Sequence, residues 1–309
     1  MKLIKNLFIV IIGMGVIFTI GTIFKEENAD AIYASEPSDS DIANDEMPST
    51  GTESNSQEKV LEEPSKIEET IIYDKDNIKI IAKEIYHKGF FGPEIKLLFE
   101  NNTDENIIFT ADDCVVNGYM VSTSMFVEVA SGKKANDSLK LMDSDLKKSA
   151  IDKFTNIDFR LNIKEADSYD DISVNNLISL TTNYAGKYTQ EYNDSGNIIY
   201  EDNEIKVVSK GILNRNDDKV LRLYIENNSN NAINIRSENV SANNFMMDNG
   251  FDELNSSLLP GTKIIDEITF SKSFLEENHI DKLELIETNL KFSKNYKEIG
   301  ESGIINIRL

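Results

Sequence analysis

The sequence has a single cysteine, Cys114, no tryptophan and two histidines in 309 residues. One cysteine excludes a disulfide within the chain, so an exported domain here must depend on its hydrophobic core alone. The histidines, His87 and His279, lie at unrelated positions and outside any nucleophile motif. A Ser-His-Asp or Cys-His site needs a base within hydrogen-bond reach of a nucleophile, and the spacing supports none. Surface histidines are expected instead.

Basic side chains are scarce relative to acidic ones. There are 32 Lys and Arg against 54 Asp and Glu, which gives a formal net charge of −22. Phosphate backbones are bound by clustered Lys and Arg, so the composition argues against a nucleic-acid partner. The same excess of acid argues against adsorption to an anionic lipid surface.

The N-terminus contains the one long apolar run, Leu7–Phe24, preceded by Lys2 and Lys5 and followed by Lys25-Glu26-Glu27. Its length lies between that of a signal-peptide core and that of a spanning helix. Ala29-Asp30-Ala31 fits a small-x-small cleavage pattern, and Ile32-Tyr33-Ala34 is a weaker one. We therefore expect residues 1–31 to be a signal peptide or a membrane anchor, rather than a buried core helix. No cysteine follows the run, which excludes bacterial lipid attachment there.

Residues 32–69 are polar, rich in acids and poor in apolar side chains. Such a composition cannot bury enough surface to offset chain entropy. We expect a disordered acidic linker that holds the folded part of the chain away from the membrane.

The remainder repeats itself. LLFENN at 97–102 returns as LYIENN at 223–228, and four further landmarks recur in the same order at nearly the same offset. This predicts two copies of one domain, at residues 70–182 and 197–309, joined by a connector at 183–196. The other matched landmarks are Ile71-Ile72-Tyr73 with Ile198-Ile199-Tyr200, Asn117-Gly118-Tyr119-Met120 with Asn243-Asn244-Phe245-Met246, Gly132-x-Lys134 with Gly261-x-Lys263, and Ala150–Lys153 with His279–Lys282.

Each copy has strand patterning. Residues 157–164 alternate apolar and polar side chains, as a strand buried on one face does. Asn117-Gly118 and Asn243-Asn244 predict hairpins, because Asn and Gly tolerate positive φ angles. Asn101-Asn102 predicts a strand end by the same tolerance and by amide bonding to the local backbone. Ser273-x-x-Glu276 predicts a capped helix, and residues 144–151 a weaker equivalent. Short strands at this spacing favour antiparallel β-sandwiches.

The first copy resembles a family of uncharacterised immunoglobulin-like domains in Gram-positive exported proteins. The segments that carry the resemblance are GPEIKLLFENN (92–102), VVNGYMV (115–121), SGKKANDSLKL (131–141) and SDLKKSAIDKF (144–154). The resemblance implies an all-β fold of two tandem immunoglobulin-like antiparallel sandwiches on an exported protein, and no established activity or ligand. The chain lacks the cysteine-rich zinc ribbon of some relatives, and the paired cysteines and core tryptophan of antibody-type domains.

Other chemical candidates have plainer explanations. Cys114 corresponds to Val240 in the second copy, which favours a buried structural side chain. The acid pairs at 112–113, 170–171 and 217–218 are expected in strands and turns rather than as an acid/base pair. The acidic turns at 74–77 and 201–204 lack the glycine and distal glutamate of a calcium loop, so hairpin turns are expected. We expect no cofactor and no metal site.

The loop from His87 to Pro93 differs between the copies. Phe90 and Phe91 lie between Gly89 and Gly92, whereas the second copy has polar residues 214–218. An aromatic pair at a loop tip can anchor a partner, although it can also cap the open end of a sandwich. Tyr119, beside its hairpin glycine, is a weaker candidate for partner contact.

Three functions fit the sequence. The first is a non-catalytic exported protein, extracellular or on the cell surface, whose two immunoglobulin-like domains bind a protein or cell-wall partner. The second is a membrane-anchored extracytoplasmic sensor or accessory subunit of an envelope system. The third is an unrecognised hydrolase. The first is preferred, with membrane contact only through the N-terminal segment if it is not cleaved.

Overall fold

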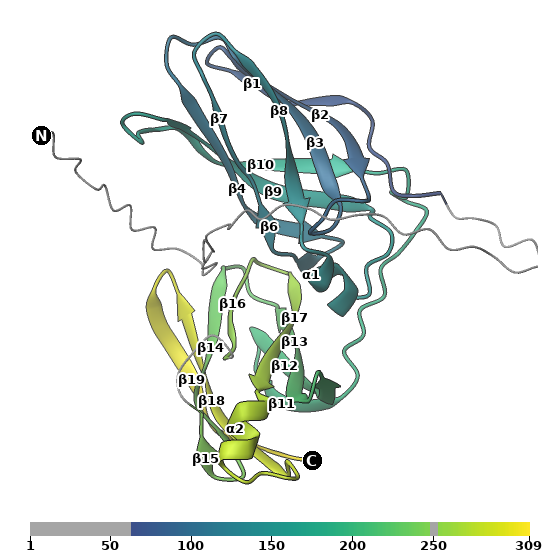
Figure 1. Cartoon of the computed structure of the whole chain (residues 1–309), viewed down its shortest axis with the longest axis vertical. Helices are drawn as coiled ribbons and strands as arrows, with labels where there is room; N and C mark the ends of the chain where they lie inside the picture. The colour runs from purple at the N-terminus through teal and green to yellow at the C-terminus, as the bar shows by residue number, and fades with distance from the viewer. Residues whose placement is uncertain (1–62, 248–252) are drawn as a thin grey trace, which may run out of the picture. The chain divides into compact units, whose positions relative to one another are not determined.

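The computed structural model describes residues 63–247 and 253–309. They form mainly strands, with two short helices, which confirms the predicted all-β class (Figure 1). Residues 60–309 make one compact unit. The predicted signal peptide or anchor at residues 1–31, and most of the predicted linker, lie outside the described residues.

Residues 70–182 are called repeat 1. Its elements are β1 (Thr70–Lys75), β2 (Ile78–Tyr86), β3 (Glu94–Asn101), β4 (Ile107–Val116), β5 (Tyr119–Met120), β6 (Thr123–Ser124), β7 (Phe126–Val129), β8 (Lys134–Leu141), α1 (Asp143–Lys148), β9 (Asn156–Glu165) and β10 (Asp171–Thr181).

Residues 197–309 are called repeat 2. Its elements are β11 (Asn197–Glu201), β12 (Ile205–Arg215), β13 (Asp218–Asn227), β14 (Ile233–Ala242), β15 (Phe245–Met246), β16 (Asn255–Leu258), β17 (Lys263–Phe270), α2 (Lys272–Glu277), β18 (Leu285–Lys294) and β19 (Lys297–Arg308).

The strands of the described residues form three sheets. One has the order β1-β2-β3-β8-β6, and another the order β15-β14-β18-β19 with β16 also on β14. The third runs through both repeats in the order β10-β9-β4-β5-β17-β13-β12-β11, with β7 also on β4. Its pairings are antiparallel except where β5 meets β17, which is parallel. Because this sheet crosses from one repeat to the other, the division into two separate domains stays a prediction.

The duplication extends to the irregularities of the sheets. The pairing of β1 with β2 shifts register between Ile71 and Tyr73, and that of β11 with β12 shifts between Ile198 and Tyr200. Likewise, the pairing of β4 with β9 shifts register around Asp113, which has φ 49°, and that of β14 with β18 shifts register around Asn239, which has φ 53°. A bulge redirects a strand at one point, so matched bulges indicate that both repeats bend alike.

Alternation of apolar residues produces the buried faces, as predicted. Ile157, Phe159, Leu161 and Ile163 of β9 are all fully buried, and β3 alternates buried and half-buried residues along its length. Two hydrophobic clusters result, one mainly in each repeat. Where the repeats meet, each cluster includes residues of the other repeat. Val208, Tyr224 and Ile265 of repeat 2 belong to the first cluster, and Val115 and Met120 of repeat 1 belong to the second.

The predicted hairpins are confirmed. Asn117 and Gly118 have φ angles of 51° and 84°, and Asn243 and Asn244 have 48° and 70°. Two successive positive φ angles are typical of the tight turn whose twist matches antiparallel strands.

Both helices occur, but the expected cap is wrong. The cap of α2 is Ser271 rather than Ser273, and its hydroxyl accepts a hydrogen bond from the Phe274 amide at 3.3 Å. Strand β17 ends at Phe270, so the chain turns into the helix two residues earlier than the capping-box pattern indicates. Helix α1 begins after Met142, which has no side chain able to cap it.

Residues 63–69, the end of the predicted linker, are described by the structure and make contacts with repeat 1. Ser65 is buried, and its hydroxyl accepts a hydrogen bond from the Phe154 amide at 2.8 Å. The amide of Lys66 donates to Asn183 Oδ1 at 2.8 Å. These contacts with distant residues are invisible to composition, which is the basis on which the linker was predicted.

Among the described residues, no helix has the length and apolar character needed to cross a membrane. The apolar run Leu7–Phe24 is outside that part of the chain.

Candidate partner-binding site

The loop between β2 and β3 presents two aromatic rings to solvent. Phe90 is 93% exposed and Phe91 is 51% exposed. Their rings pack edge to face with centroids 5.0 Å apart, an arrangement that the aromatic quadrupole favours. The alternative expectation is that both rings cap the end of the sheets. Phe90 is too exposed to do so.

Backbone hydrogen bonds hold this loop against the start of α1. The Asp143 amide donates to the Phe91 carbonyl and the Leu141 amide donates to the Pro93 carbonyl, both at 2.9 Å. Within the loop, the Gly92 amide donates to the Gly89 carbonyl at 3.3 Å. The exposed rings are therefore carried by a backbone that is already fixed, which lowers the entropy that a partner would have to remove.

The two glycines are required by close contacts. Gly92 has φ 140°, and a Cβ there would lie 2.4 Å from the Leu141 carbonyl oxygen. A Cβ on Gly89 would lie 2.4 Å from the Gly92 carbonyl oxygen and 2.5 Å from Glu94 Oε1. Neither position accepts a side chain without a shift of backbone, so the sequence Gly-Phe-Phe-Gly specifies this loop shape.

A cluster of polar side chains lies at the ends of the two strands that this loop joins. Glu94 accepts hydrogen bonds from Lys96 and from Ser138, the latter at 3.0 Å. The Lys96 bond is the main cause that lowers the pKa of Glu94, with help from Ser138 and against the effect of burial. The carboxylate is therefore ionised at neutral pH. Lys96 Nζ also lies 5.0 Å from the centroid of the half-exposed Tyr86 ring.

His87 anchors the start of the loop. Its Nε2 lies 2.7 Å from the Ser65 carbonyl oxygen, and its ring stacks on Phe154 with centroids 6.1 Å apart. These contacts tie the loop to the segment before β1, and they give His87 a positioning role in the fold.

The corresponding loop of repeat 2 is a tight polar turn. Asn216 and Asp217 occupy it with φ angles of 48° and 74°. Lys272 binds Asp217 through its ammonium group at 3.0 Å and Asp218 through its backbone amide at 2.8 Å. Repeat 2 has no aromatic side chain at residues 214–218, so the two repeats differ where the predicted contact lies.

Tyr119 lies apart from the aromatic loop, at the junction between the repeats. It is 2% exposed, and its ring centroid is 5.5 Å from that of Tyr192 in the connector. Burial, with a smaller effect from Tyr192, raises the pKa of Tyr119 to about 12. The structure does not bring Tyr119 together with Phe90 and Phe91, and its side chain already has contacts within the chain.

The other candidates have structural partners. Cys114 is buried, as predicted. Asp112 accepts a hydrogen bond from Asn162 Nδ2 at 2.7 Å, and Asp113 pairs with Arg160 Nε at 3.2 Å. Asp202 accepts from the amides of Glu204 and Ile205 at 2.7 and 2.8 Å, which makes its turn a hydrogen-bonded one. No group of three potential metal ligands occurs among the described residues.

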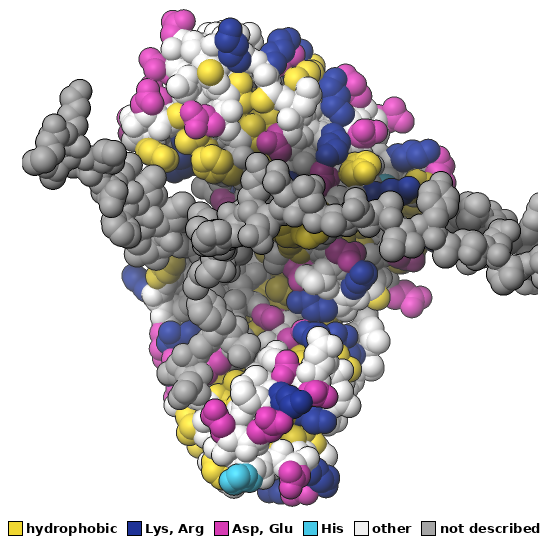
Figure 2. Space-filling view, viewed as in Figure 1, with side chains coloured by type: hydrophobic (Ala, Val, Ile, Leu, Met, Phe, Trp, Pro, Cys, Tyr) yellow, Lys and Arg dark blue, Asp and Glu magenta, His cyan; other side chains and the backbone are white. Residues whose placement is uncertain are grey.

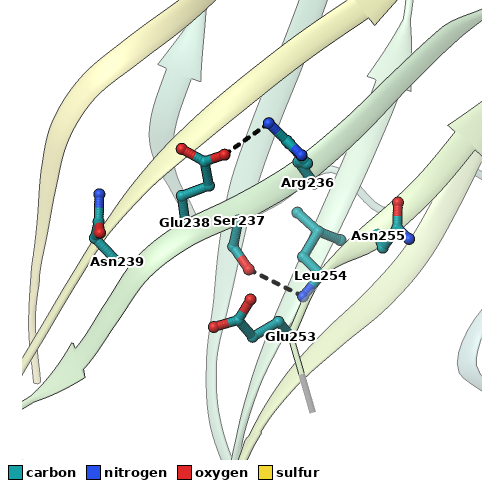
Figure 3. A pocket seen from close by; sticks show the side chains of 7 residues that line it. All are labelled: Arg236, Ser237, Glu238, Asn239, Glu253, Leu254 and Asn255. Carbon is teal, nitrogen blue, oxygen red and sulfur yellow. Dashed lines mark hydrogen bonds and ion pairs between the residues drawn. The ribbon is translucent and has the colours of Figure 1, made fainter. Parts of the chain in front are cut away.

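The sequence did not indicate an open pocket of about 470 Å³ in repeat 2, between β14 and the residues before β16. Arg236 pairs with Glu238 at 2.7 Å, and Ser237 accepts a hydrogen bond from the Leu254 amide at 3.1 Å (Figure 3). One carboxyl oxygen of Glu253 is buried without a hydrogen-bond partner among the described residues. Burial, and then the charge of Glu238, raise the pKa of Glu253.

Open sheet edges are the remaining surface that a partner could use. β1 and β10 each end their sheet. An open hollow of about 370 Å³ lies between them and includes Ile71 and Leu177, which are more than half exposed. On the face drawn in Figure 2, Lys and Arg are interspersed with Asp and Glu, with apolar patches between them.

No family model matches the sequence, and no curated protein matches it. Solved structures give weak likenesses. A red sea bream transglutaminase has a TM-score of 0.22 at 8% identity and covers 78% of this chain and 31% of its own. An Amycolatopsis orientalis exo-chitosanase, CsxA, has a TM-score of 0.21 at 12% identity over 73% of this chain and 26% of its own. A Bacteroides uniformis beta-glucuronidase 2 has a TM-score of 0.22 at 9% identity, and the match covers 69% of this chain and 26% of the glucuronidase chain. The chain spans less than a third of the length of each, and likenesses this weak carry no functional argument.

Proposed function

We propose that the chain is a non-catalytic exported protein of the cell surface, and that its two immunoglobulin-like sandwich domains bind a protein or cell-wall partner. Phe90 and Phe91 are the proposed contact. The observation that carries this proposal is Phe90, a residue that is 93% exposed on a loop held by backbone hydrogen bonds.

The strand order supports the immunoglobulin-like part of the proposal. In repeat 1 the order β2-β3-β8-β6 faces β10-β9-β4 across the first hydrophobic cluster. Immunoglobulin domains place strands A, B, E and D on one sheet and G, F and C on the other. Assigning β2, β3, β4, β6, β8, β9 and β10 to strands A to G in chain order reproduces both sheets. Strand β1 is then an addition before A.

Energetics favour burial of the aromatic pair by a partner. Moving one Phe side chain from water to a dry interface is worth about 1.5–3 kcal/mol. Interfaces are enriched in aromatic residues at the centre and have a polar rim. Tyr86, Glu94 and Lys96, at the ends of the two strands that the loop joins, supply polar groups for such a rim. A single exposed aromatic needs no explanation, but a paired one on a fixed loop calls for one.

The test uses immobilised residues 60–309, which form one compact unit, and the same segment with Phe90→Ser and Phe91→Ser. Each is exposed to bacterial envelope and host-surface fractions, with and without calcium, and with and without prior protease treatment of the fractions. The proposal expects a component retained by the parent segment and lost by the double variant. Protease sensitivity then separates a protein partner from a wall polymer. Equal retention by both segments, or retention by neither, overturns it.

A further inference from the structure

The junction between the repeats is a specific contact in which a hairpin meets a sheet edge. The Asn117-Gly118 hairpin of repeat 1 carries β5, and Tyr119 of β5 pairs with Lys263 of β17 in parallel. The Lys263 amide donates to the Gly118 carbonyl at 3.0 Å. Tyr192 donates from its hydroxyl to the Asn117 carbonyl at 3.0 Å, and Lys263 Nζ lies 4.3 Å from its ring centroid.

An apolar row in repeat 2 completes this contact. Val208, Tyr224 and Ile265 are register partners across β12, β13 and β17. All three are buried and belong to the hydrophobic cluster of repeat 1. Repeat 1 therefore covers the outer face of this sheet, and β5 extends its edge.

Both halves of this contact have an equivalent among the described residues: the equivalent hairpin is exposed, and the equivalent receiving row is partly exposed. The equivalent of the Tyr119-Met120 strand is Phe245-Met246, on a hairpin of the same shape. Tyr119 is 2% exposed and Met120 9%, whereas Phe245 is 45% exposed and Met246 56%. Tyr119 and Met120 are buried because repeat 2 packs against them, and no equivalent sheet packs against Phe245 and Met246 among the described residues.

The receiving face has an equivalent in repeat 1. Ile81, Leu98 and Asn136 are register partners across β2, β3 and β8, as Val208, Tyr224 and Ile265 are in repeat 2. Ile81 and Leu98 are half-buried and Asn136 is exposed. The flanking ion pair is also duplicated: Lys134 with Glu100 at 2.8 Å, and Lys263 with Glu226 at 3.2 Å.

We infer that these two surfaces bind each other between chains: the Phe245-Met246 hairpin of one molecule docks against β8 and the Ile81-Leu98 row of a second copy. The contact is head to tail, because it joins two different surfaces. A pair of molecules therefore still has one unoccupied hairpin and one unoccupied receiving face. Such an interface builds rings or open chains rather than closed dimers. This association is independent of the contact proposed for Phe90 and Phe91.

The contact between chains is weaker than the one within the chain. Asn136 stands where Ile265 buries apolar surface, and the connector at 183–196 holds the internal pair at a high effective concentration. The net charge of −22 also opposes association at low salt. Assembly is therefore expected at high protein concentration and to increase with salt, because salt screens the repulsion.

The first experiment is analytical ultracentrifugation of residues 60–309 over a wide concentration range at low and raised salt. The inference expects a weight-average mass that rises past that of a dimer, and a variant with Phe245→Ser and Met246→Ser that stays monomeric. The matched control is Ile299→Ser with Ile304→Ser, which removes apolar residues that are 46% and 71% exposed on β19. All of these positions are exposed, so the melting temperatures should be unchanged.

The second experiment tests the register. Because Tyr119 pairs with Lys263, repeat equivalence places Phe245 of one chain opposite Lys134 of the next. Neighbouring strands lie within disulfide range, so Phe245→Cys and Lys134→Cys chains, mixed and oxidised, should form a mixed disulfide dimer. Ile304→Cys mixed with Lys134→Cys is the control. A mass that stays monomeric at every concentration, or cross-linking no greater than the control, overturns the inference.

Discussion

Asn101 and Asn227 make corresponding hydrogen bonds at the same place in the two repeats, and Asn227 makes one more. The side-chain amide of Asn101 donates to the carbonyls of Glu105 and Val129, and its oxygen accepts from the amide and hydroxyl of Thr103. The side-chain amide of Asn227 donates to the carbonyls of Asn231, Leu258 and Leu259, and its oxygen accepts from the amide and hydroxyl of Ser229. Both side chains are fully buried.

We predict that Asn101→Ala or Asn227→Ala lowers the free energy of unfolding by about 2–4 kcal/mol, because each leaves buried backbone groups without partners. Denaturant unfolding followed by circular dichroism measures the loss. Asn102→Ala is the matched control, since Asn102 is the exposed member of the same Asn-Asn pair. Equal and small losses for Asn101 and Asn102 would contradict the role given to the buried amide.

This pair also separates what the sequence could predict from what it could not. The recurrence of Glu-Asn-Asn at a strand end predicted a turn, and amide bonding to local backbone is confirmed. The expected left-handed backbone is wrong, because neither Asn101 nor Asn102 has a positive φ. Local patterning specified the strands and the hairpins, since these depend on side-chain alternation and on the φ angles that Asn and Gly tolerate.

Contacts across long sequence separations were out of reach. Tyr119 follows a hairpin glycine, a position usually exposed, but it is buried because repeat 2 covers it. Ser65 lies in an acidic segment, but it is buried because Phe154 and His87 bind it. For the candidate site, the sequence indicated Phe90 and Phe91, whereas their exposure depends on hydrogen bonds to residues of β8 and α1.

The junction gives a second prediction. Tyr192→Ala removes the hydroxyl bond to Asn117 and the ring beneath Lys263. The Lys263 amide, which donates to Gly118, should then exchange its hydrogen about tenfold faster, as expected for a loss of roughly 1.4 kcal/mol. Hydrogen exchange resolved to single residues measures this. Tyr169→Ala, at an exposed tyrosine, is the control. Unchanged exchange at Lys263 would show that the ring does not stabilise the junction.

A third prediction concerns pH. Burial and the charge of Glu238 raise the pKa of Glu253 above the ordinary 4.5, so its ionised form is less favourable in the folded state than in the unfolded state. At pH values above 4.5 the folded state then binds more protons than the unfolded state, so the free energy of unfolding falls as pH rises. Glu253→Gln should be more stable than the parent at pH 7, and the difference should vanish well below pH 4.5.

Glu267 provides the opposite control. Burial would raise its pKa, but hydrogen bonds from Arg215 and Arg222 outweigh that effect and lower it. Its contribution to stability is complete above 4.5 and is lost as pH falls through the lowered value. Glu267→Gln should therefore be less stable than the parent at pH 7 and approach it in acid. Melting temperatures across pH 3–8 test both variants, and parallel pH trends for the two would contradict the assignment.

A fourth prediction concerns Cys114. Burial, with a smaller effect from the charge of Asp158, raises the pKa of its thiol far above the ordinary 9.0. Because the thiolate is the reactive form, the native chain should resist iodoacetamide, and the unfolded chain should be modified fully. Lys134→Cys, at an exposed position, is expected to react in the native state. Rapid modification of native Cys114 would show that it is accessible.

The most direct measurement compares binding and stability of one variant, Phe90→Ser with Phe91→Ser, in residues 60–309. We expect retention on the fraction bound by the parent segment to fall at least about tenfold, since about 1.4 kcal/mol or more of aromatic burial is removed, while the melting temperature is unchanged. Unchanged retention, or a large drop in melting temperature, would contradict the proposal that this loop binds a partner.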